Sequence, residues 1–254
     1  MIGRSDEYGK MFRIEQRLWW YRILHETVAR HLEQRFGPRR DITILDAGCG
    51  TGGLLDFLRK RGYTNLRGID GSTDAVQFCH ERGLDVLLVN LNQLANHAPE
   101  QSYEAIICND VFCYFDDTAL TRLLTELSRR LNPGGLLLSN NNAFSVFWGQ
   151  HDLAIGSTRR FVRADFARLL PPTGLQLRNS TYWSLALSPL ILLARQWQRL
   201  QLRLGLSHPG QPTSDVYLPH PFVNETLYRI VRAEQTLLPR TPFGSSLFIG
   251  GQKG

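Results

Sequence analysis

Short apolar runs alternate with amphipathic stretches between residues 42 and 140. The runs are rich in Ile, Val and Leu, which is typical of strands buried on both faces of a parallel sheet. They span residues 42–48, 65–70, 85–90, 103–110 and 135–140. This alternation predicts βαβ units, and therefore an α/β fold with a mostly parallel sheet and helices on both faces.

The stretches between the runs carry helix signals. Residues 73–83 begin with a Thr-Asp cap signal and end in glycine. The stretch that begins at residue 116 repeats leucine at helical spacing until Asn-Pro-Gly-Gly stops it at residues 132–135. Its leucines are Leu120, Leu123, Leu124, Leu127 and Leu131.

The flanks predict further elements around this core. Residues 8–36 are expected to be helical, residues 141–160 irregular, and residues 164–171 helical, followed by a strand at 175–183. Two helices separated by a Pro/Gly loop at 207–215 then interrupt the alternation before a last strand at 245–253. We therefore expect a helical cap (1–40), a core (41–183), a helical insertion (184–240) and a final core strand (241–254).

Composition narrows the class of protein. The 254 residues are 43% hydrophobic, which is enough for one sizeable core with a subdomain added. The net charge of +6 comes mostly from arginines spread along the chain, which indicates a solvated surface rather than a nucleic-acid site. The four cysteines form no CxxC pair, and neither an apolar leader nor a run of ~18 apolar residues is present. These features predict free buried thiols, no metal site and a cytoplasmic protein.

A glycine-rich loop follows the first predicted strand in the sequence ILDAGCGTGG, residues 44–53. Glycines 48, 50 and 52 keep side chains away, so that a ligand can lie against the backbone at the carboxyl edge of the sheet. Asp70 ends the next strand, where a carboxylate can accept hydrogen bonds from ribose hydroxyls. The loop also satisfies the dinucleotide pattern G-x-G-x-x-G. Asp46 distinguishes a dinucleotide from a cofactor with an amino-acid tail. Its carboxylate would repel the pyrophosphate of a dinucleotide and would favour a cationic amino-acid tail.

These motifs together resemble those of class I S-adenosylmethionine-dependent methyltransferases. The resemblance covers roughly residues 40–180 and rests on residues 46–52, 69–70, 108–111 and 132–135. The flanks resemble a bacterial group of small-molecule methyltransferases, of the type 11 and type 12 kind. Its two motifs are represented here by Trp19, Trp20, Tyr21 and Arg22, and by Trp148, His151, Asp152, Gly156, Arg159, Arg160 and Phe161.

The resemblance implies a Rossmann-like seven-stranded sheet, S-adenosyl-L-methionine as cofactor and S-adenosyl-L-homocysteine as product. It assigns the methionine moiety to Asp46, Gly48, Cys49, Gly50 and Gly52. The ribose would be held by Asp70 with Gly71, and the adenine would lie between Asn90 and Leu91, although many members have aspartate where Asn90 stands. Asn109 would face the sulfonium, and Trp20 would cover the cofactor.

Acceptor and catalytic residues are expected after the fourth and fifth strands. His151 is the candidate general base, with Asp152 beside it; alternatively, both residues brace the 141–160 segment through hydrogen bonds. Tyr114 and Trp148 are candidates for the acceptor pocket. Arg159 and Arg160 would bind an anionic acceptor, or else be solvated or pair with a helix. No His, Asp and Glu cluster has metal-ligand spacing.

The first helix of the insertion allows three interpretations. Arg195, Arg199 and Arg203 recur every four residues and predict a basic stripe. An apolar face is predicted from Leu192, Leu193, Trp197, Leu200 and Leu204. The helix could pack as a lid over the acceptor, form a homodimer contact, or attach peripherally to an anionic membrane.

The sequence therefore predicts a methyltransferase that acts on an oxygen or nitrogen of a small molecule, such as a natural product, a sugar or a lipid-linked compound. A nucleotide-cofactor oxidoreductase and a non-catalytic cofactor-binding protein remain as alternatives. Nucleic acid is disfavoured as acceptor because the sequence contains no Asn-Pro-Pro-Tyr-type loop and no concentrated basic patch.

Overall fold

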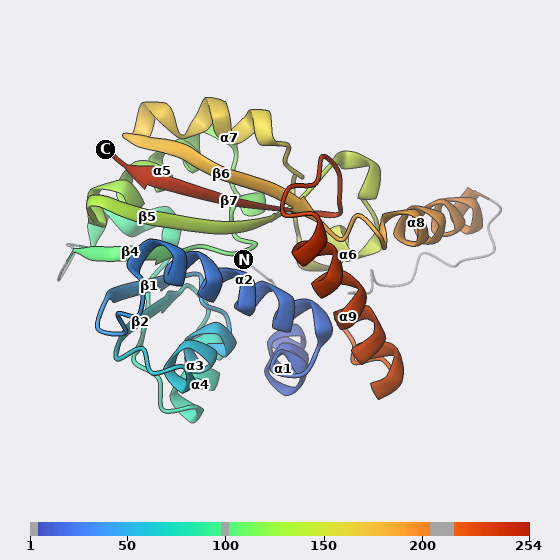
Figure 1. Ribbon diagram of the computed structural model, residues 1–254, viewed down its shortest axis with the longest axis horizontal. Coiled ribbons are helices and arrows are strands. Elements are labelled where there is room, and N and C mark those ends of the chain that lie inside the picture. Colours follow the sequence, from blue (N-terminus) through green and yellow to red (C-terminus); the bar gives the residue numbers. More distant parts are fainter. Residues whose placement is uncertain (1–4, 98–101, 204–215) are drawn as a thin grey trace.

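A seven-stranded sheet organises the residues that the computed structural model describes, which are 5–97, 102–203 and 216–254 (Figure 1). The strand order is β3-β2-β1-β4-β5-β7-β6. Neighbours among β1 to β5 run parallel, and β7 runs antiparallel to both β5 and β6. The predicted mostly parallel, Rossmann-like sheet is confirmed. The strands are β1 (Thr43–Ala47), β2 (Asn65–Asp70), β3 (Val86–Leu88), β4 (Tyr103–Ile107), β5 (Leu131–Asn142), β6 (Leu175–Trp183) and β7 (Ser246–Lys253).

Helices cover both faces of the sheet, as predicted. Three of them begin with side-chain caps, since Ser72 accepts from the Ala75 N–H, Asp116 from the Ala119 N–H and His220 from the Phe222 N–H. The α-helices are α1 (Ser5–Ile14), α2 (Trp19–Phe36), α3 (Gly53–Lys60), α4 (Thr73–Glu81), α5 (Asp117–Arg130), α6 (Gln150–Ile155), α7 (Arg163–Leu169), α8 (Ser188–Arg203) and α9 (Pro221–Leu237). The described ranges also contain four short 3-10 helices: η1 (Leu91–Asn96), η2 (Phe112–Tyr114), η3 (Ser145–Phe147) and η4 (Pro171–Thr173).

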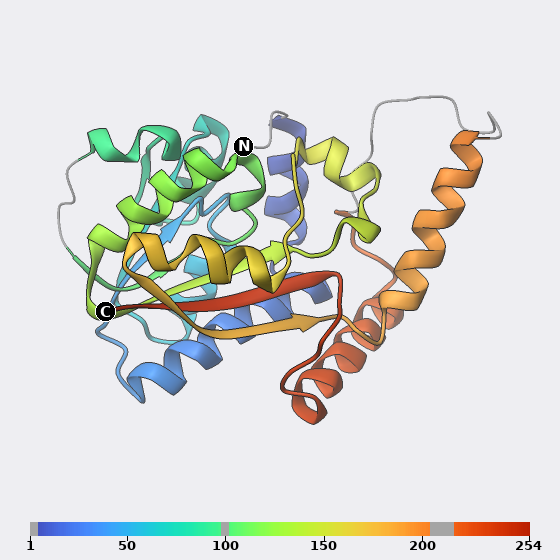
Figure 2. The same cartoon turned by 90° about the horizontal axis from the view of Figure 1, so that it is seen from above.

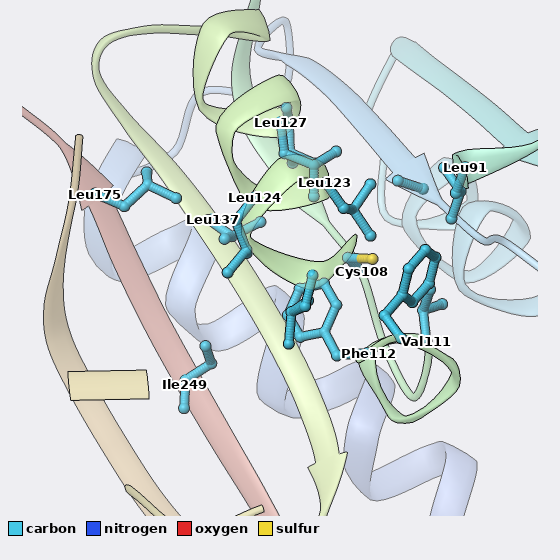
Figure 3. Packing of buried hydrophobic residues seen from close by; sticks show 14 of the residues in the cluster. Leu91, Cys108, Val111, Phe112, Leu123, Leu124, Leu127, Leu137, Leu175 and Ile249 are labelled. Atoms are coloured by element: carbon cyan, nitrogen blue, oxygen red, sulfur yellow. The ribbon is translucent and has the colours of Figure 1, made fainter. Parts of the chain in front are cut away.

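Leucine spacing in α5 builds the core on one face of the sheet. Leu123, Leu124 and Leu127 are buried against Leu137 of β5 and Phe112 (Figure 3). The other face is covered by α2 and α3, where a second buried cluster joins Ile23, Val28 and Leu32 to Ile44, Ile107 and Leu138. The two clusters fix the sheet between its helical layers.

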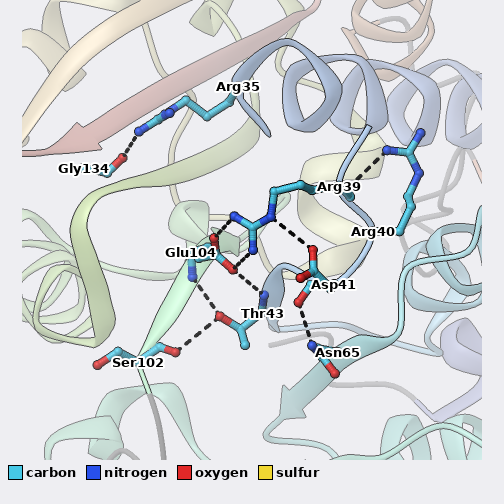
Figure 4. Close-up of polar contacts among 9 residues, drawn as sticks. All are labelled: Arg35, Arg39, Arg40, Asp41, Thr43, Asn65, Ser102, Glu104 and Gly134. Atoms are coloured by element: carbon cyan, nitrogen blue, oxygen red, sulfur yellow. Dashed lines mark hydrogen bonds and ion pairs between the residues drawn. The ribbon is translucent and has the colours of Figure 1, made fainter. Parts of the chain in front are cut away.

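An ion-pair network joins the segment between α2 and β1 to the amino end of β4 (Figure 4). Arg39 Nη1 lies 2.6 Å from Glu104 Oε1, and Arg39 Nε lies 3.1 Å from Asp41 Oδ1. The other Glu104 oxygen accepts from the Thr43 N–H at 3.2 Å. The network therefore joins the segment after α2 to β4, at the sheet edge opposite the glycine loop.

Several predicted boundaries require correction. Residues 8–36 form two helices rather than one region, because a turn separates α1 from α2. β5 starts at Leu131, before the Asn-Pro-Gly-Gly turn, because Leu131 is buried and pairs with Tyr103 ahead of a register shift. The 141–160 segment is not wholly irregular. Asp152 Oδ2 accepts from the Gly149 N–H at 2.9 Å and closes the first turn of α6, so His151 lies in a helix.

The apolar residues predicted on one face of α8 are exposed, and one arginine of the predicted stripe is buried. Arg195 is only 7% exposed, whereas Leu193, Trp197 and Leu200 are 68%, 59% and 45% exposed. The apolar pattern of this helix has two sides, and the structure buries the side that carries Arg195. The predicted loop at 207–215, Leu204, and the side chains of Arg199 and Arg203 lie outside the described residues. No helix in the described ranges is long and apolar enough to cross a bilayer.

Candidate functional site

A cavity of about 750 Å³ opens at the carboxyl ends of β1, β2, β4 and β5. Helices α1, α2, α6 and α8 complete its walls. It brings together thirteen of the residues singled out in the sequence: Trp20, Asp46, Gly48, Cys49, Gly50, Asp70, Gly71, Asn90, Leu91, Asn109, Tyr114, His151 and Arg160. Four others, Gly52, Trp148, Asp152 and Arg159, do not line it.

The glycine loop adopts a backbone that side chains would disturb. Gly48, Gly50 and Gly52 have φ values of 82°, 54° and 79°. A Cβ atom on Gly48 would lie less than 3.0 Å from Val111 Cγ2, and one on Gly52 would lie 2.5 Å from Leu84 Cδ1. Gly52 therefore supports the loop from the protein side, whereas Gly48 and Gly50 present backbone to the cavity.

Asp70 holds the loop against the end of β2. Its Oδ2 accepts from the Gly50 N–H at 2.9 Å and its Oδ1 from the Ser72 N–H at 2.9 Å. Burial raises the pKa of Asp70, and these backbone hydrogen bonds oppose the rise. The carboxylate keeps acceptor capacity for a ligand, because each oxygen has a second lone pair.

Asp46 is the most strongly perturbed acid of the strand edge. Its side chain is buried at the end of β1. Burial, reinforced by the charges of Asp70 and Glu15, raises the pKa of Asp46 to about 8. A cation placed in the cavity beside this group would favour its ionised form.

Asn109 and Asp110 follow β4 and are joined to β5. Asn109 Oδ1 accepts from the Asn140 N–H at 2.9 Å, and the Asn140 amide donates to Asp110 Oδ1 at 3.0 Å. Asp110 has a φ of 56°, and burial raises its pKa to about 7. Its place in the cavity wall was not predicted, although an acid directly after a buried strand was a signal for it.

Helix α1 belongs to the predicted helical cap and closes the cavity over the glycine loop, a position that was not predicted. Tyr8 is 4% exposed, and burial followed by the charge of Asp70 raises its pKa. Met11 lies close enough that a Cβ on Gly50 would come within 3.2 Å of its sulfur. Trp20 of α2 also lines the cavity, with its ring centroid 5.6 Å from that of Trp183 at the end of β6.

A buried ion pair locks these helices onto the loop. Glu15, between α1 and α2, accepts from Arg82 Nη2 at 2.6 Å and from the Thr51 hydroxyl. Burial outweighs these contacts and raises the pKa of Glu15 to about 7. Arg82 also donates to the Phe12 carbonyl at 3.0 Å, so the pair spans α1, the loop and the end of α4.

His151 and Asp152 lie in different surroundings. Asp152 is fully buried and forms a two-pronged ion pair with Arg160, whose Nε and Nη2 lie 2.9 Å from its two oxygens. This pair braces α6 and does not place Asp152 in the cavity. His151 is half-buried and lines the cavity wall.

Of the remaining candidates for acceptor binding, some line the cavity and others do not. Tyr114 lines the cavity, and burial raises its pKa. Arg159 pairs with Asp117 and lies 4.5 Å from the Phe161 ring centroid, outside the cavity wall. Arg195 of α8, which had been assigned to a basic stripe, lines the cavity instead.

Charge is unevenly distributed around the cavity. The strand ends and α1 contribute acids, whereas α6, α8 and the segment after α6 contribute His151, Arg195 and Arg160. The acids are Glu7, Glu15, Asp46, Asp70 and Asp110. A cationic group fits the strand edge, and a pyrophosphate does not. Within the described residues, no group of three His, Cys, Asp or Glu side chains is arranged to hold a metal ion.

Residues 44–135 match the model of a family described as a methyltransferase domain. Human methyltransferase-like protein 27 is 32% identical over 103 residues, which is 40% of this chain and 41% of that protein. The ubiquinone biosynthesis O-methyltransferase of Paracidovorax citrulli is 26% identical over 188 residues, which cover 66% of this chain and 76% of the relative. A geranyl diphosphate 2-C-methyltransferase of Streptomyces ambofaciens is 27% identical, with 64% and 62% covered. The chain thus spans less than two thirds of the length of two of these three relatives.

Solved structures share the fold at low sequence identity. The magnesium protoporphyrin IX methyltransferase of Synechocystis with bound S-adenosylmethionine has a TM-score of 0.53 and 14% identity, covering 91% of this chain and 78% of that one. The geranyl diphosphate C-methyltransferase of Streptomyces coelicolor, in a complex that holds S-adenosylhomocysteine, has a TM-score of 0.55 and 18% identity, covering 90% and 78%. At such identities the likeness establishes the fold.

Proposed function

The chain belongs, through residues 44–135, to the class I S-adenosylmethionine-dependent methyltransferases, and from that premise we propose that it methylates an oxygen or nitrogen of a small-molecule acceptor. One observation carries the proposal. The glycine loop, Asp46 and Asp70 meet in one cavity whose strand edge is acidic. This edge suits a cofactor with a cationic tail, and none of the relatives described above supports the oxidoreductase alternative.

The residues of the strand edge fit S-adenosylmethionine. Asp46 is buried, and a neighbouring cation would stabilise its ionised carboxylate; the amino group of the methionine moiety is such a cation. Asp70 would accept hydrogen bonds from the ribose hydroxyls, and Gly71 would lie beside the ribose. Asn90 and Leu91 would flank the adenine. Asn109 would lie toward the sulfonium. Trp20 would cover the cofactor from α2. When bound, the cofactor supplies an electrophilic methyl group on sulfur.

The protein's own contribution is positioning and proton transfer. Holding an acceptor atom ~3 Å from the methyl can supply about 7–11 kcal/mol of the barrier. Tyr114 on one wall and His151 on another would orient the acceptor, and we assign His151 as the base that removes its proton, worth roughly 10²–10⁴-fold. Asp152 and Arg160 would act as a brace for α6. Trp148 and Arg159 have no assigned contact with the acceptor.

The acceptor end of the cavity indicates a molecule with an apolar body. Its walls there are mostly hydrophobic, and α8 closes them as a lid. The lining residues include Phe147, Ile155, Leu187, Ile191 and Leu227. We expect no nucleic-acid acceptor. We place the protein in the cytoplasm, because all four cysteines are free and buried.

Calorimetric titration tests the cofactor, and turnover tests the reaction. The protein should bind S-adenosylmethionine in the micromolar range and ignore NADH. Incubation with a set of hydroxylated and amino metabolites should release S-adenosylhomocysteine with at least one of them. NADH binding without S-adenosylmethionine binding would overturn the family's chemistry here. Cofactor binding without turnover on any acceptor would favour a non-catalytic cofactor-binding protein.

A further inference from the structure

A second cavity, of about 310 Å³, lies where α2 and α9 meet the edge of the sheet. The two helices contact each other on one face of the sheet (Figures 1 and 2). The walls of the second cavity come from α2, from the edge strand β6, and from the end of α9 with the segment that follows it. It shares no lining residue with the cavity at the carboxyl ends of the strands, so it is a separate candidate site.

Most of the side chains that line the second cavity are polar. Its charged and hydrogen-bonding side chains include Arg30, His31, Gln34, Asn179, Glu234 and Arg240. Its volume lies near the lower end of the range for small-molecule sites, which is roughly 300–1,000 Å³. The size and the polar walls together indicate a small ligand that is itself charged or strongly polar.

Glu234 brings an unsatisfied carboxylate oxygen to the second cavity. The residue is 6% exposed, and its Oε2 accepts from the Ala186 N–H at 2.7 Å. Its Oε1 is buried and has no hydrogen-bond partner among the described residues. Leaving a buried acceptor unpaired costs free energy, and most such groups in folded proteins have a partner. An N–H group of a ligand, above all an ammonium, would supply the missing donor.

Two arginines line the same cavity. Arg30 donates to the side-chain oxygen of Gln235 at 3.1 Å, and neither Arg30 nor Arg240 forms an ion pair with a carboxylate of the described residues. Burial first, and then the charge of Arg232, lower the pKa of Arg30, whereas Glu26 opposes this change. An anionic group in the cavity would favour the charged form of the guanidinium. The cavity therefore complements a ligand that carries both a cation and an anion.

Neighbouring side chains in the cavity wall are held in place. His31 Nδ1 lies 2.8 Å from the Thr27 carbonyl oxygen, so Nδ1 carries the proton and Nε2 of the neutral ring is an acceptor. Burial lowers the pKa of His31, although the hydrogen bond to Thr27 opposes the change, so the ring is neutral at pH 7. Gln235 is fixed between Arg30 and Thr27, to whose hydroxyl it donates at 3.2 Å. Side chains that are already ordered lose little conformational entropy when a ligand binds.

We propose that the second cavity binds a free amino acid, with its ammonium group on Glu234 and its carboxylate on Arg30 and Arg240. The site goes beyond the proposed methyl transfer and does not rest on it. A ligand with one of the two charges would leave the opposite charge of the cavity unpaired. A metal ion is not favoured, because no group of three His, Cys, Asp or Glu side chains in the described ranges could hold one.

Thermal unfolding of the full chain with each of the protein amino acids identifies the probe, and calorimetry then measures its dissociation constant. The N-acetyl derivative and the carboxamide of the same amino acid should each bind about tenfold more weakly or worse, because each lacks one of the two charges. Saturating S-adenosylhomocysteine should leave the dissociation constant of the amino acid unchanged, because the two cavities share no lining residue.

Glu234→Gln should weaken binding of the amino acid by about tenfold or more. The amide oxygen can still accept from the Ala186 N–H, whereas the amide nitrogen presents donors to the ammonium in place of an acceptor. Arg240→Ala should weaken binding in the same way. The matched control Glu225→Gln, on the same helix and outside both cavities, should leave the affinity unchanged.

The derivatives are tested on the unaltered protein, so the result does not depend on how the variants fold. The proposal would be overturned if no amino acid raised the melting temperature, if both derivatives bound as tightly as the parent amino acid, or if Glu234→Gln kept the parent affinity. Displacement of the amino acid by S-adenosylhomocysteine would also overturn it, because the amino acid would then occupy the first cavity. Titration with S-adenosylhomocysteine alone reports separately on the proposed function.

Discussion

Asp70 reaches back from the end of β2 to the glycine loop, where its Oδ2 accepts a hydrogen bond from the Gly50 N–H at 2.9 Å. The same carboxylate holds the Ser72 N–H at the start of α4. This residue therefore shapes the loop and also presents an acceptor to the cavity. A substitution at this position affects both roles, and the choice of side chain can separate them.

Asp70→Asn should weaken cofactor binding more than tenfold and lower the melting temperature of the apo protein less than Asp70→Ala does. The amide oxygen still accepts from one of the two backbone N–H groups, whereas the charge-assisted hydrogen bond to ribose, worth about 1.5–3 kcal/mol, is lost. Asp70→Ala should weaken binding and also lower stability, because two backbone donors lose their partner. Calorimetry and thermal unfolding of both variants provide the check. Unchanged affinity in both would place Asp70 away from the ribose.

The site residues at the carboxyl ends of the strands could be predicted from the sequence. Loops that follow parallel strands meet at this end of the sheet regardless of contacts elsewhere in the fold. It could not predict α1 over the loop or Arg195 in the cavity. Those positions depend on contacts between remote segments, such as the 3.0 Å hydrogen bond from Arg82 Nη2 to the Phe12 carbonyl of α1. Helix α8 illustrates the limit, since a helix with two apolar sides gives no local signal for which side is buried.

Gly48→Ala should destabilise the protein and impair cofactor binding. At a φ of 82° an alanine costs about 1–2 kcal/mol, and its Cβ would collide with Val111 Cγ2 for a further ~1–3 kcal/mol. Gly156→Ala is the matched control: it has a φ of 72° and nothing within 4 Å of the added Cβ. Chemical denaturation should show the larger loss at Gly48. The double variant Gly48→Ala/Val111→Ala should recover part of that loss, and failure to do so would argue against the collision.

Cofactor affinity should rise between pH 6 and pH 8. Burial first, and then the charges of Asp70 and Glu15, raise the pKa of Asp46 from 3.8 to about 8, so the free protein holds a proton there at neutral pH. A bound cation favours the ionised carboxylate, so binding releases that proton and strengthens by up to about tenfold per pH unit. Calorimetry in buffers of different ionisation heat measures the release.

The variant Asp46→Asn isolates this effect from the other acids of the cavity. It should bind more weakly and lose most of the pH dependence, because no carboxylate remains to titrate beside the cation. The contribution of Asp46 to folding stability depends on pH in the opposite direction. The raised pKa means that Asp46 stabilises the apo fold most fully below pH 3.8 and loses that contribution as the pH rises through about 8. Equal proton release by parent and variant would assign the effect to another group.

His151→Ala should keep the cofactor affinity of the parent and lose about 10²-fold or more in turnover, because a base acts on the acceptor. The pH–rate profile should lose the acid limb that protonation of the base produces. The neighbouring Asp152→Ala is the comparison. It breaks a fully buried ion pair with Arg160, so it should cost about 3–5 kcal/mol in stability and leave the acid limb of any remaining activity in place. Were His151→Ala to lose stability and retain the acid limb, His151 would be a further brace of α6, and catalysis would proceed by positioning alone.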